Sequence, residues 1–134
     1  MILINYFARY REQLNLGGEG EVRGFVNVNP MLGNQHGVEE ILQRDPTGAL
    51  LIAGAEALPY PDGSVKEIRG NALPSPVLGS HGRQIADEIR RVLAPGGVAQ
   101  FSSRSGFPPE LIKHLRAHGF QVIGDRAARF TQPA

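Results

Sequence analysis

The sequence contains no cysteine, so disulfide bonds and thiolate catalysis are excluded, and no redox compartment is indicated. It also lacks an excess of charge of either sign. Its 14 lysine and arginine residues stand against 13 aspartate and glutamate residues, which gives a formal net charge of +1. This balance gives no general reason to expect binding to nucleic acid or to an anionic membrane. Internal repeats and low-complexity segments are absent as well.

No apolar run is long enough to cross a membrane. The chain begins with MILINYF, but Arg9, Arg11 and Glu12 follow closely, and no small-residue cleavage site is present. The opening segment is therefore predicted to be neither a signal peptide nor a membrane span. We expect no membrane contact and a cytoplasmic location.

Several catalytic signatures are missing. The sequence has no G-x-x-x-x-G-K-[ST] loop and no G-x-S-x-G elbow, and Gly20 and Gly24 are one residue too far apart for a G-x-G-x-x-G fingerprint. His114 and His118 form an i, i+4 pair, but no third ligand lies at a suitable spacing. We therefore expect no metal site, no phosphate-loop NTPase activity and no serine-hydrolase elbow.

The 134 residues, 41% of them hydrophobic and 20% charged, suit one globular domain with a single core. Leu3, Phe7, Tyr10 and Leu14 fall at helical spacing, which predicts an amphipathic helix over residues 2–12. Residues 1–12 would then lead into a core formed by residues 13–134.

Apolar runs and turn signals alternate along the core. Strands are predicted at Leu14–Leu16, Phe25–Val28, Ala49–Ala53, Val65–Arg69, Val98–Ser102, Phe120–Ile123 and Ala128–Thr131. Helices are predicted at Gly37–Arg44, from Ser80 to a stop at Pro95-Gly96-Gly97, and at Pro108–His118. This alternation predicts an α/β fold with a mostly parallel sheet, helices on both faces, and a final hairpin that gives one antiparallel edge. The mixed charges around Arg83, Arg90 and Arg91 are predicted to form a solvated helix face.

The stretch LNLGGEGEVRGFVNVNP, residues 14–30, places an unusual number of glycines between the first two strands. Glycine is costly in conformational entropy, so the loop is either a tight structural turn or a surface where a ligand meets bare backbone. Only nine residues run from Gly17 to Phe25, fewer than a parallel crossover with a helix usually takes. The first helix is therefore predicted to be abbreviated or absent.

Five segments stand in a fixed order: LNLGG, GFVNVNP, AEALPYPDGSVKEI, EIRRVLAPGGVAQFSS and ELIKHLRAHGFQVI. Together they resemble class I S-adenosylmethionine-dependent methyltransferases. The likeness is most specific at ALPYPDGSVKEI and EIRRVLAPGG, where the family carries LPFPDGSFDEV and EIRRVLKPGG. The resemblance implies a Rossmann-like methyltransferase fold with a seven-stranded sheet, S-adenosylmethionine as the cofactor, and methyl transfer to an unidentified acceptor.

The resemblance also implies which residues contact the cofactor. They follow the first four strands: Gly17, Gly18, Glu19, Gly20 and Glu21 at the methionine end, Asn29 at the ribose, Ala55 and Glu56 at the adenine edge, and Asn71 in the segment that faces the reactive methyl group. His81 would be placed as a general base, because imidazole titrates near physiological pH. A lone surface histidine at a helix start is the alternative.

Three positions depart from the family pattern, because Asn15, Asn29 and Gly54 stand where an acidic residue is usual. Glu19 or Glu21 can supply the carboxylate that Asn15 lacks. Asn29 is either a ribose ligand or one half of an Asn-Pro turn, and Tyr60 is either a packing aromatic or a stacking surface for adenine.

The same departures support a second hypothesis. The chain would then be a degenerate or repurposed methyltransferase-like domain that binds a partner without methyl transfer. Similar sequences occur as effector domains of bacterial polymorphic toxins. That resemblance implies a cognate immunity or carrier protein, and delivery to the cytoplasm of a target cell.

Overall fold

The computed structural model describes residues 2–3, 13–18, 21–29, 40, 43–44, 49–73 and 75–134. The described strands are β1 (Ile2–Leu3), β2 (Gln13–Leu16), β3 (Val26–Asn29), β4 (Ala49–Ile52), β5 (Val65–Leu73), β6 (Leu93–Ser103), β7 (Gln121–Ile123) and β8 (Ala127–Thr131). Two helices, α2 (Ser75–Val92) and α3 (Pro109–Ala117), complete the described elements. Glu40, Gln43 and Arg44 are also helical, while the rest of the predicted 37–44 helix lies outside the described residues.

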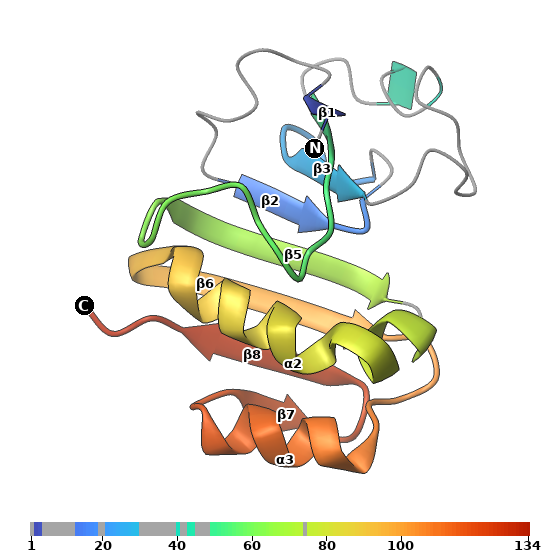
Figure 1. Ribbon diagram of the computed structural model, residues 1–134, viewed down its shortest axis with the longest axis vertical. Coiled ribbons are helices and arrows are strands. Elements are labelled where there is room, and N and C mark those ends of the chain that lie inside the picture. The colour runs from blue at the N-terminus through green and yellow to red at the C-terminus, as the bar shows by residue number, and fades with distance from the viewer. Residues whose placement is uncertain are drawn as a thin grey trace.

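The strands form one sheet in the order β1-β4-β3-β2-β5-β6-β8-β7 (Figure 1). The five central strands, β2 to β6, pair in parallel, and β1, β7 and β8 pair antiparallel. The predicted α/β class with a mostly parallel sheet is confirmed. No helix occurs among the described residues between β2 and β3, as the short connection required.

Two details of the predicted sheet are wrong. The described sheet has eight strands instead of seven, and antiparallel strands lie at both edges instead of one. The additional strand is β1, whose residues Ile2 and Leu3 pair with Ile52 and Leu51 of β4. The predicted helix over 2–12 therefore fails at its start, because pairing with an exposed edge strand outweighs local helical spacing. Residues 4–12 lie outside the described residues.

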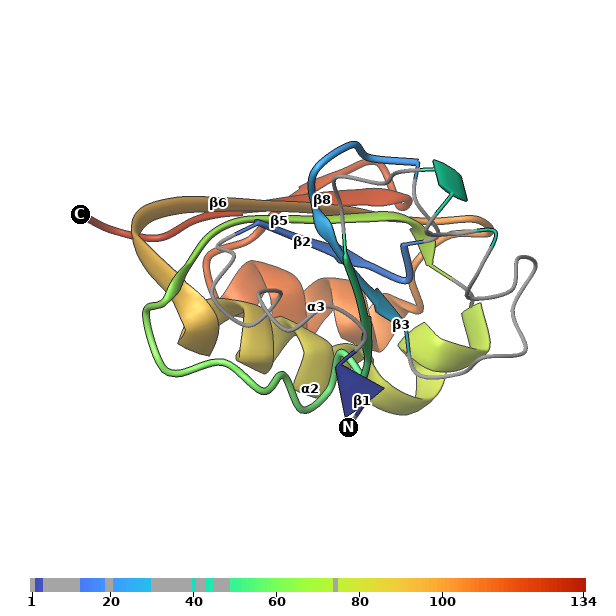
Figure 2. The same cartoon turned by 90° about the horizontal axis from the view of Figure 1, so that it is seen from above.

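The apolar residues of the strands and helices meet on one face of the sheet. Ile85 and Ile89 of α2 and Leu115 of α3 are completely buried there, together with Leu14 of β2 and Ile68 of β5. Turning the molecule by 90° shows both helices on this face, below the sheet in the view of Figure 2. The stripe predicted from the spacing of Ile85 and Ile89 is thus confirmed as the buried side of α2.

In the second half of the chain each predicted element is present with different bounds: α2, β5, β6 and β8 are longer than predicted, and α3 and β7 are shorter. The helix α2 begins at Ser75, five residues before the predicted start, and Pro76 lies in its first turn. Proline is tolerated there because the first amides of a helix have no partner within it. The last two strands pair antiparallel as a hairpin, as predicted.

Candidate functional site

A glycine turn ends β2 and joins it to β3. Gly17 has a φ of +70°, and its N–H donates a 2.7 Å hydrogen bond to the carbonyl oxygen of Val28. A Cβ atom at position 18 would lie 2.6 Å from both Asn15 Nδ2 and Asn27 Oδ1, closer than real contacts allow. Two buried side-chain amides therefore pack directly on the Gly18 backbone, and a side chain at this position would displace them.

The carboxylate of Glu21 returns to the end of β2. Glu21 Oε1 accepts a 2.8 Å hydrogen bond from Asn15 Nδ2, and Asn15 is completely buried. Asn15 occupies the position where the resembled methyltransferases carry an acidic residue, so Glu21 brings a carboxylate next to that position. Among the described residues, Asn15 Oδ1 is a buried acceptor without a hydrogen-bond partner. Glu19 and Gly20 lie outside the described residues.

After β4, the carboxylate of Glu56 likewise lies beside a position, Gly54, that has lost its acidic side chain. A Cβ atom at position 54 would overlap the carboxylate of Glu56, so this carboxylate occupies the place where a side chain at 54 would begin. The loop starts next to β3, because the Ala53 N–H donates a 3.2 Å hydrogen bond to the Asn29 carbonyl oxygen. Asn29 is 2% exposed, and Ala55 and Glu56 are half-buried. The ends of β2, β3 and β4 therefore lie next to one another.

A charged pair on α2 holds the segment that follows. Glu88 Oε1 accepts a 2.7 Å hydrogen bond from the Leu58 N–H. Arg91 donates to the carbonyl oxygens of Leu58 and Tyr60 at 2.9 and 2.8 Å, to Asp62 Oδ1 at 2.8 Å, and to both oxygens of Glu88. The connection between β4 and β5 contains no helix, so this pair fixes loop 58–62 on α2.

The ionisation of these groups follows from their contacts. The hydrogen bond from Arg91 holds the pKa of the Glu88 carboxyl below its usual value, and the Leu58 N–H adds to the effect. The pKa of Arg91 is raised by its hydrogen bonds to Glu88 and Asp62. Burial raises the pKa of Tyr60 to about 12, and its ring belongs to the apolar core. Tyr60 therefore packs in the core as one of the two sequence hypotheses expected.

The predicted solvated face on α2 needs a correction. Arg83, Asp87 and Arg90 are exposed, but the Arg91 side chain is only 34% exposed and that of Glu88 only 17%. Helical periodicity could not predict the contacts of Glu88 and Arg91, because the backbone groups that they bind belong to a loop about 30 residues earlier in the chain. The signal in the sequence was the joint occurrence of ALPYPDG and EIRRVL.

Two further predicted site residues, Asn71 and His81, differ in their position relative to the glycine turn. Arg69 of β5 lies opposite Asn15 of β2, so Asn71, two residues further along β5, lies beside the end of β2 and is exposed. His81 is exposed on the second turn of α2 and makes no hydrogen bond or ion pair with a described residue. Asn71 therefore lies at the strand ends, whereas no contact among the described residues places His81 there.

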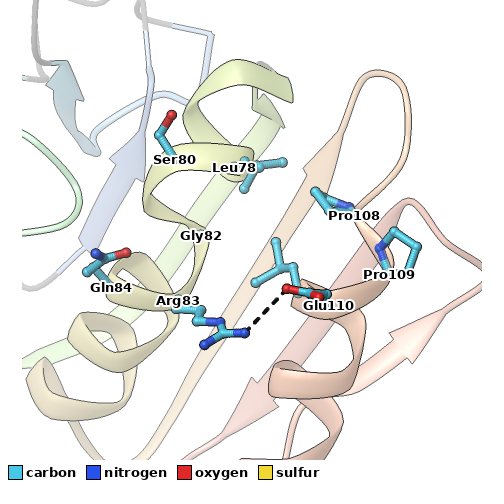
Figure 3. A pocket seen from close by; sticks show the side chains of 10 residues that line it. Leu78, Ser80, Gly82, Arg83, Gln84, Pro108, Pro109 and Glu110 are labelled. Carbon is cyan, nitrogen blue, oxygen red and sulfur yellow. Dashed lines mark ion pairs between the residues drawn. The ribbon is translucent and has the colours of Figure 1, made fainter.

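Sequence reasoning did not identify a groove of about 540 Å³ between the starts of α2 and α3. In Figure 3, Arg83 and Glu110 face each other across it, and their charged atoms are 3.7 Å apart. Within the described part of the chain, no group of three or more histidine and acidic side chains could hold a metal ion. No helix in that part is both long and apolar enough to cross a membrane.

No family model and no curated protein matches the chain. Solved structures do. The aminoglycoside resistance methyltransferase NpmB1 aligns with a TM-score of 0.63 at 16% identity, over 92% of this chain and 88% of that one. A 16S rRNA (adenine(1408)-N(1))-methyltransferase variant from Catenulisporales acidiphilia, solved with its cosubstrate SAM, has a TM-score of 0.60 at 16% identity, over 95% of this chain and 87% of that one.

The cyclase SpnF also aligns, with a TM-score of 0.61 at 18% identity, over 84% of this chain and 52% of that one. The chain therefore has the Rossmann-like fold of class I methyltransferases. At these identities the likeness shows the fold alone, and the cyclase illustrates that one fold hosts more than one chemistry.

Proposed function

We propose that this chain binds S-adenosylmethionine at the carboxyl ends of β2, β3 and β4 and transfers its methyl group to an acceptor. The observation that carries the proposal is the return of two carboxylates to positions where the sequence had lost them. Glu21 lies on Asn15, and Glu56 fills the space of a side chain at Gly54. Both positions carry an acid in the methyltransferases that the sequence resembles.

The residues present fit the cofactor. Gly17 exposes backbone at the end of β2, where Glu21 offers a carboxylate for the ammonium group of the methionine end, and Gly18 makes room for the buried amides of Asn15 and Asn27. Asn29 would hold the ribose with an amide oxygen, and Ala55 and Glu56 would hold the adenine edge. When bound, S-adenosylmethionine supplies an electrophilic methyl group. The protein contributes by binding, by orienting the acceptor beside Asn71, and by excluding water.

Isothermal titration with S-adenosylmethionine and S-adenosylhomocysteine tests this proposal. The isosteric variants Glu21→Gln and Glu56→Gln should each weaken binding about tenfold to a hundredfold, because each removes a charge-assisted hydrogen bond of about 1.5–3 kcal/mol. The control Glu110→Gln changes an exposed carboxylate on α3 and should bind as the parent does. No binding at millimolar cofactor, or equal binding by all variants, would remove the proposal.

The second candidate is a partner-binding module without methyl transfer, acting in the cytoplasm or delivered there as a toxin domain. It is supported by Asn29, which is buried at the ribose position without a charge. This candidate predicts indifference to the cofactor and a stable complex with a cognate immunity or carrier protein. Radiolabelled methyl transfer that Glu56→Gln reduces would contradict it.

A further inference from the structure

One face of the sheet is polar over β5, β6 and β8, and no described helix covers it there. In Figure 2, α2 and α3 lie below β5, β6 and β8, and no described helix lies above them. One row in register crosses this upper face from Leu50 of β4, and its next six members are all polar: Asn27, Asn15, Arg69, Gln100, Arg129 and Gln121. A parallel sheet covered by helices on both faces would have apolar residues in such a row. Asn27 and Asn15 are buried, whereas the four members on β5, β6, β8 and β7 are exposed, so that part of the face can meet water or a polar ligand.

The exposed part of this row borders a hollow of about 400 Å³ near the carboxyl ends of β5 and β6. Arg69 and Asn71 from β5, Gln100 from β6 and Arg129 from β8 line it. At its rim lies Ile123 of β7, which is 65% exposed and is the exposed large apolar side chain among the described residues. The hollow thus combines two cations, two amides and one apolar wall.

The guanidinium group of Arg69 is held in place from two sides. Its Nε donates a 3.0 Å hydrogen bond to Glu67 Oε2, and its central carbon lies 5.2 Å from the centroid of the Phe25 ring. Its two Nη atoms make no hydrogen bond with a described residue. The terminal donors of a side chain that is already oriented therefore remain available to a ligand.

Arg129 supplies the second cation. It is exposed and makes no ion pair within the part of the chain that the structure describes. Arg69 and Arg129 both lie opposite Gln100, one on each neighbouring strand. Adjacent strands are about 4.8 Å apart, so the two Cα atoms are separated by about 10 Å. Two arginine side chains can close that distance onto a single anion placed above Gln100.

We propose that this hollow binds the phosphate group of a small phosphorylated ligand, and that this ligand is the methyl acceptor. A phosphate has enough acceptor oxygens to meet two guanidinium groups and the amides of Gln100 and Asn71 together. Ile123 would contact an apolar part of the ligand. The ligand is small and not a nucleic acid, because Glu67 lies beside Arg69 and the net charge of +1 provides no extended basic path.

The acceptor role rests on the proposed function, because it depends on the position of Asn71 beside the end of β2. The phosphate site itself does not. It requires only the two arginines and the amide between them.

Titration of the isotope-labelled protein with inorganic phosphate, followed by amide NMR shifts at low salt, tests the site. We expect shifts in β5, β6 and β8, and about tenfold weaker binding for Arg69→Gln and for Arg129→Gln. The control Arg116→Gln removes the same charge from an exposed position on α3 and should bind phosphate as the parent does. Thermal unfolding of each variant shows whether it remains folded.

Three results would overturn the phosphate site: no binding, equal loss in the Arg116→Gln control, or acetate binding as tightly as phosphate. A single-stranded oligonucleotide that binds much more tightly than phosphate, with a steep salt dependence, would overturn the choice of a small ligand. S-adenosylhomocysteine affinity is measured for the same proteins. If the parent binds phosphate through the two arginines but no cofactor, the proposed function fails and the anion site stands. If the cofactor binds and phosphate does not, only the present inference fails.

Discussion

The hydrogen bonds from Arg91 that hold loop 58–62 on α2 act as a clamp. Replacing Arg91 with methionine removes this clamp while keeping a long side chain on α2. The lost donors serve the carbonyl oxygens of Leu58 and Tyr60 and the carboxylate of Glu88. A hydrogen bond that involves a charged group contributes about 1.5–3 kcal/mol. Because the Arg91 side chain is 34% exposed, water replaces part of what is lost. We therefore expect a total loss of about 2–3 kcal/mol in the free energy of unfolding.

Urea and thermal unfolding measure this loss. For a domain of this length 1 kcal/mol corresponds to about 4 °C, so the melting temperature should fall by about 8–12 °C. The neighbouring variant Arg90→Met is the matched control. The recorded contact of Arg90 is made by its backbone oxygen with Gln132, so this variant should stay within about 0.5 kcal/mol of the parent. A loss below 0.5 kcal/mol for Arg91→Met would refute the clamp.

The clamp also predicts a pH dependence. The pKa of Glu88 is lower in the folded than in the unfolded chain, so its carboxylate contributes stability above the unfolded pKa. That contribution is lost as the pH falls through the folded pKa, below the ordinary value of 4.5. The parent should therefore lose stability in acid more steeply than Arg91→Met. Parallel acid profiles for the two proteins would contradict the assignment.

Three further substitutions test the structure. Gly18→Ala places a Cβ 2.6 Å from two buried amides and should cost about 1–3 kcal/mol in urea unfolding, so an unchanged midpoint would show that the amides pack elsewhere. Ile89→Ala opens a cavity at a fully buried position of α2 and should cost about 2–5 kcal/mol, whereas a loss below 1 kcal/mol would place Ile89 outside the core. His81→Ala should unfold as the parent does, and a methyl-transfer rate that falls by about a hundredfold or more would support its role as general base. An unchanged rate would end that role.

The sheet could be predicted because its central strands are short apolar or alternating segments bounded by turn residues. Val26 and Val28 of β3 are examples, since their burial and their Asn-Pro stop are both local properties. The pairing of Ile2 and Leu3 with β4 could not be predicted. It depends on an edge some 50 residues later in the chain, and local spacing favoured a helix for the same residues.

The sequence predicted which strand ends lie together, and the role of the residues there stays a prediction. The resemblance pointed to Gly17, Gly18 and the loop around Glu56, and the structure brings the corresponding strand ends together. The sequence alone could not show that the Glu56 carboxylate returns over Gly54, because the direction of a side chain depends on the fold of its loop. The clamp that Arg91 forms was missed for a related reason. The sequence of α2 shows that Arg91 is charged but does not show that loop 58–62 packs against it.

The two edges of the sheet limit how this molecule associates with others. A strand at an edge presents unpaired backbone groups, which can recruit a strand from another chain. Here the outermost described strands are β1 and β7, with two and three residues, and each offers only a short row of such groups. Strand addition, the usual route to aggregation of open sheets, therefore has little template at either side. Within the part of the chain that the structure describes, the larger surfaces open to a partner are those of the helices and the face of the sheet.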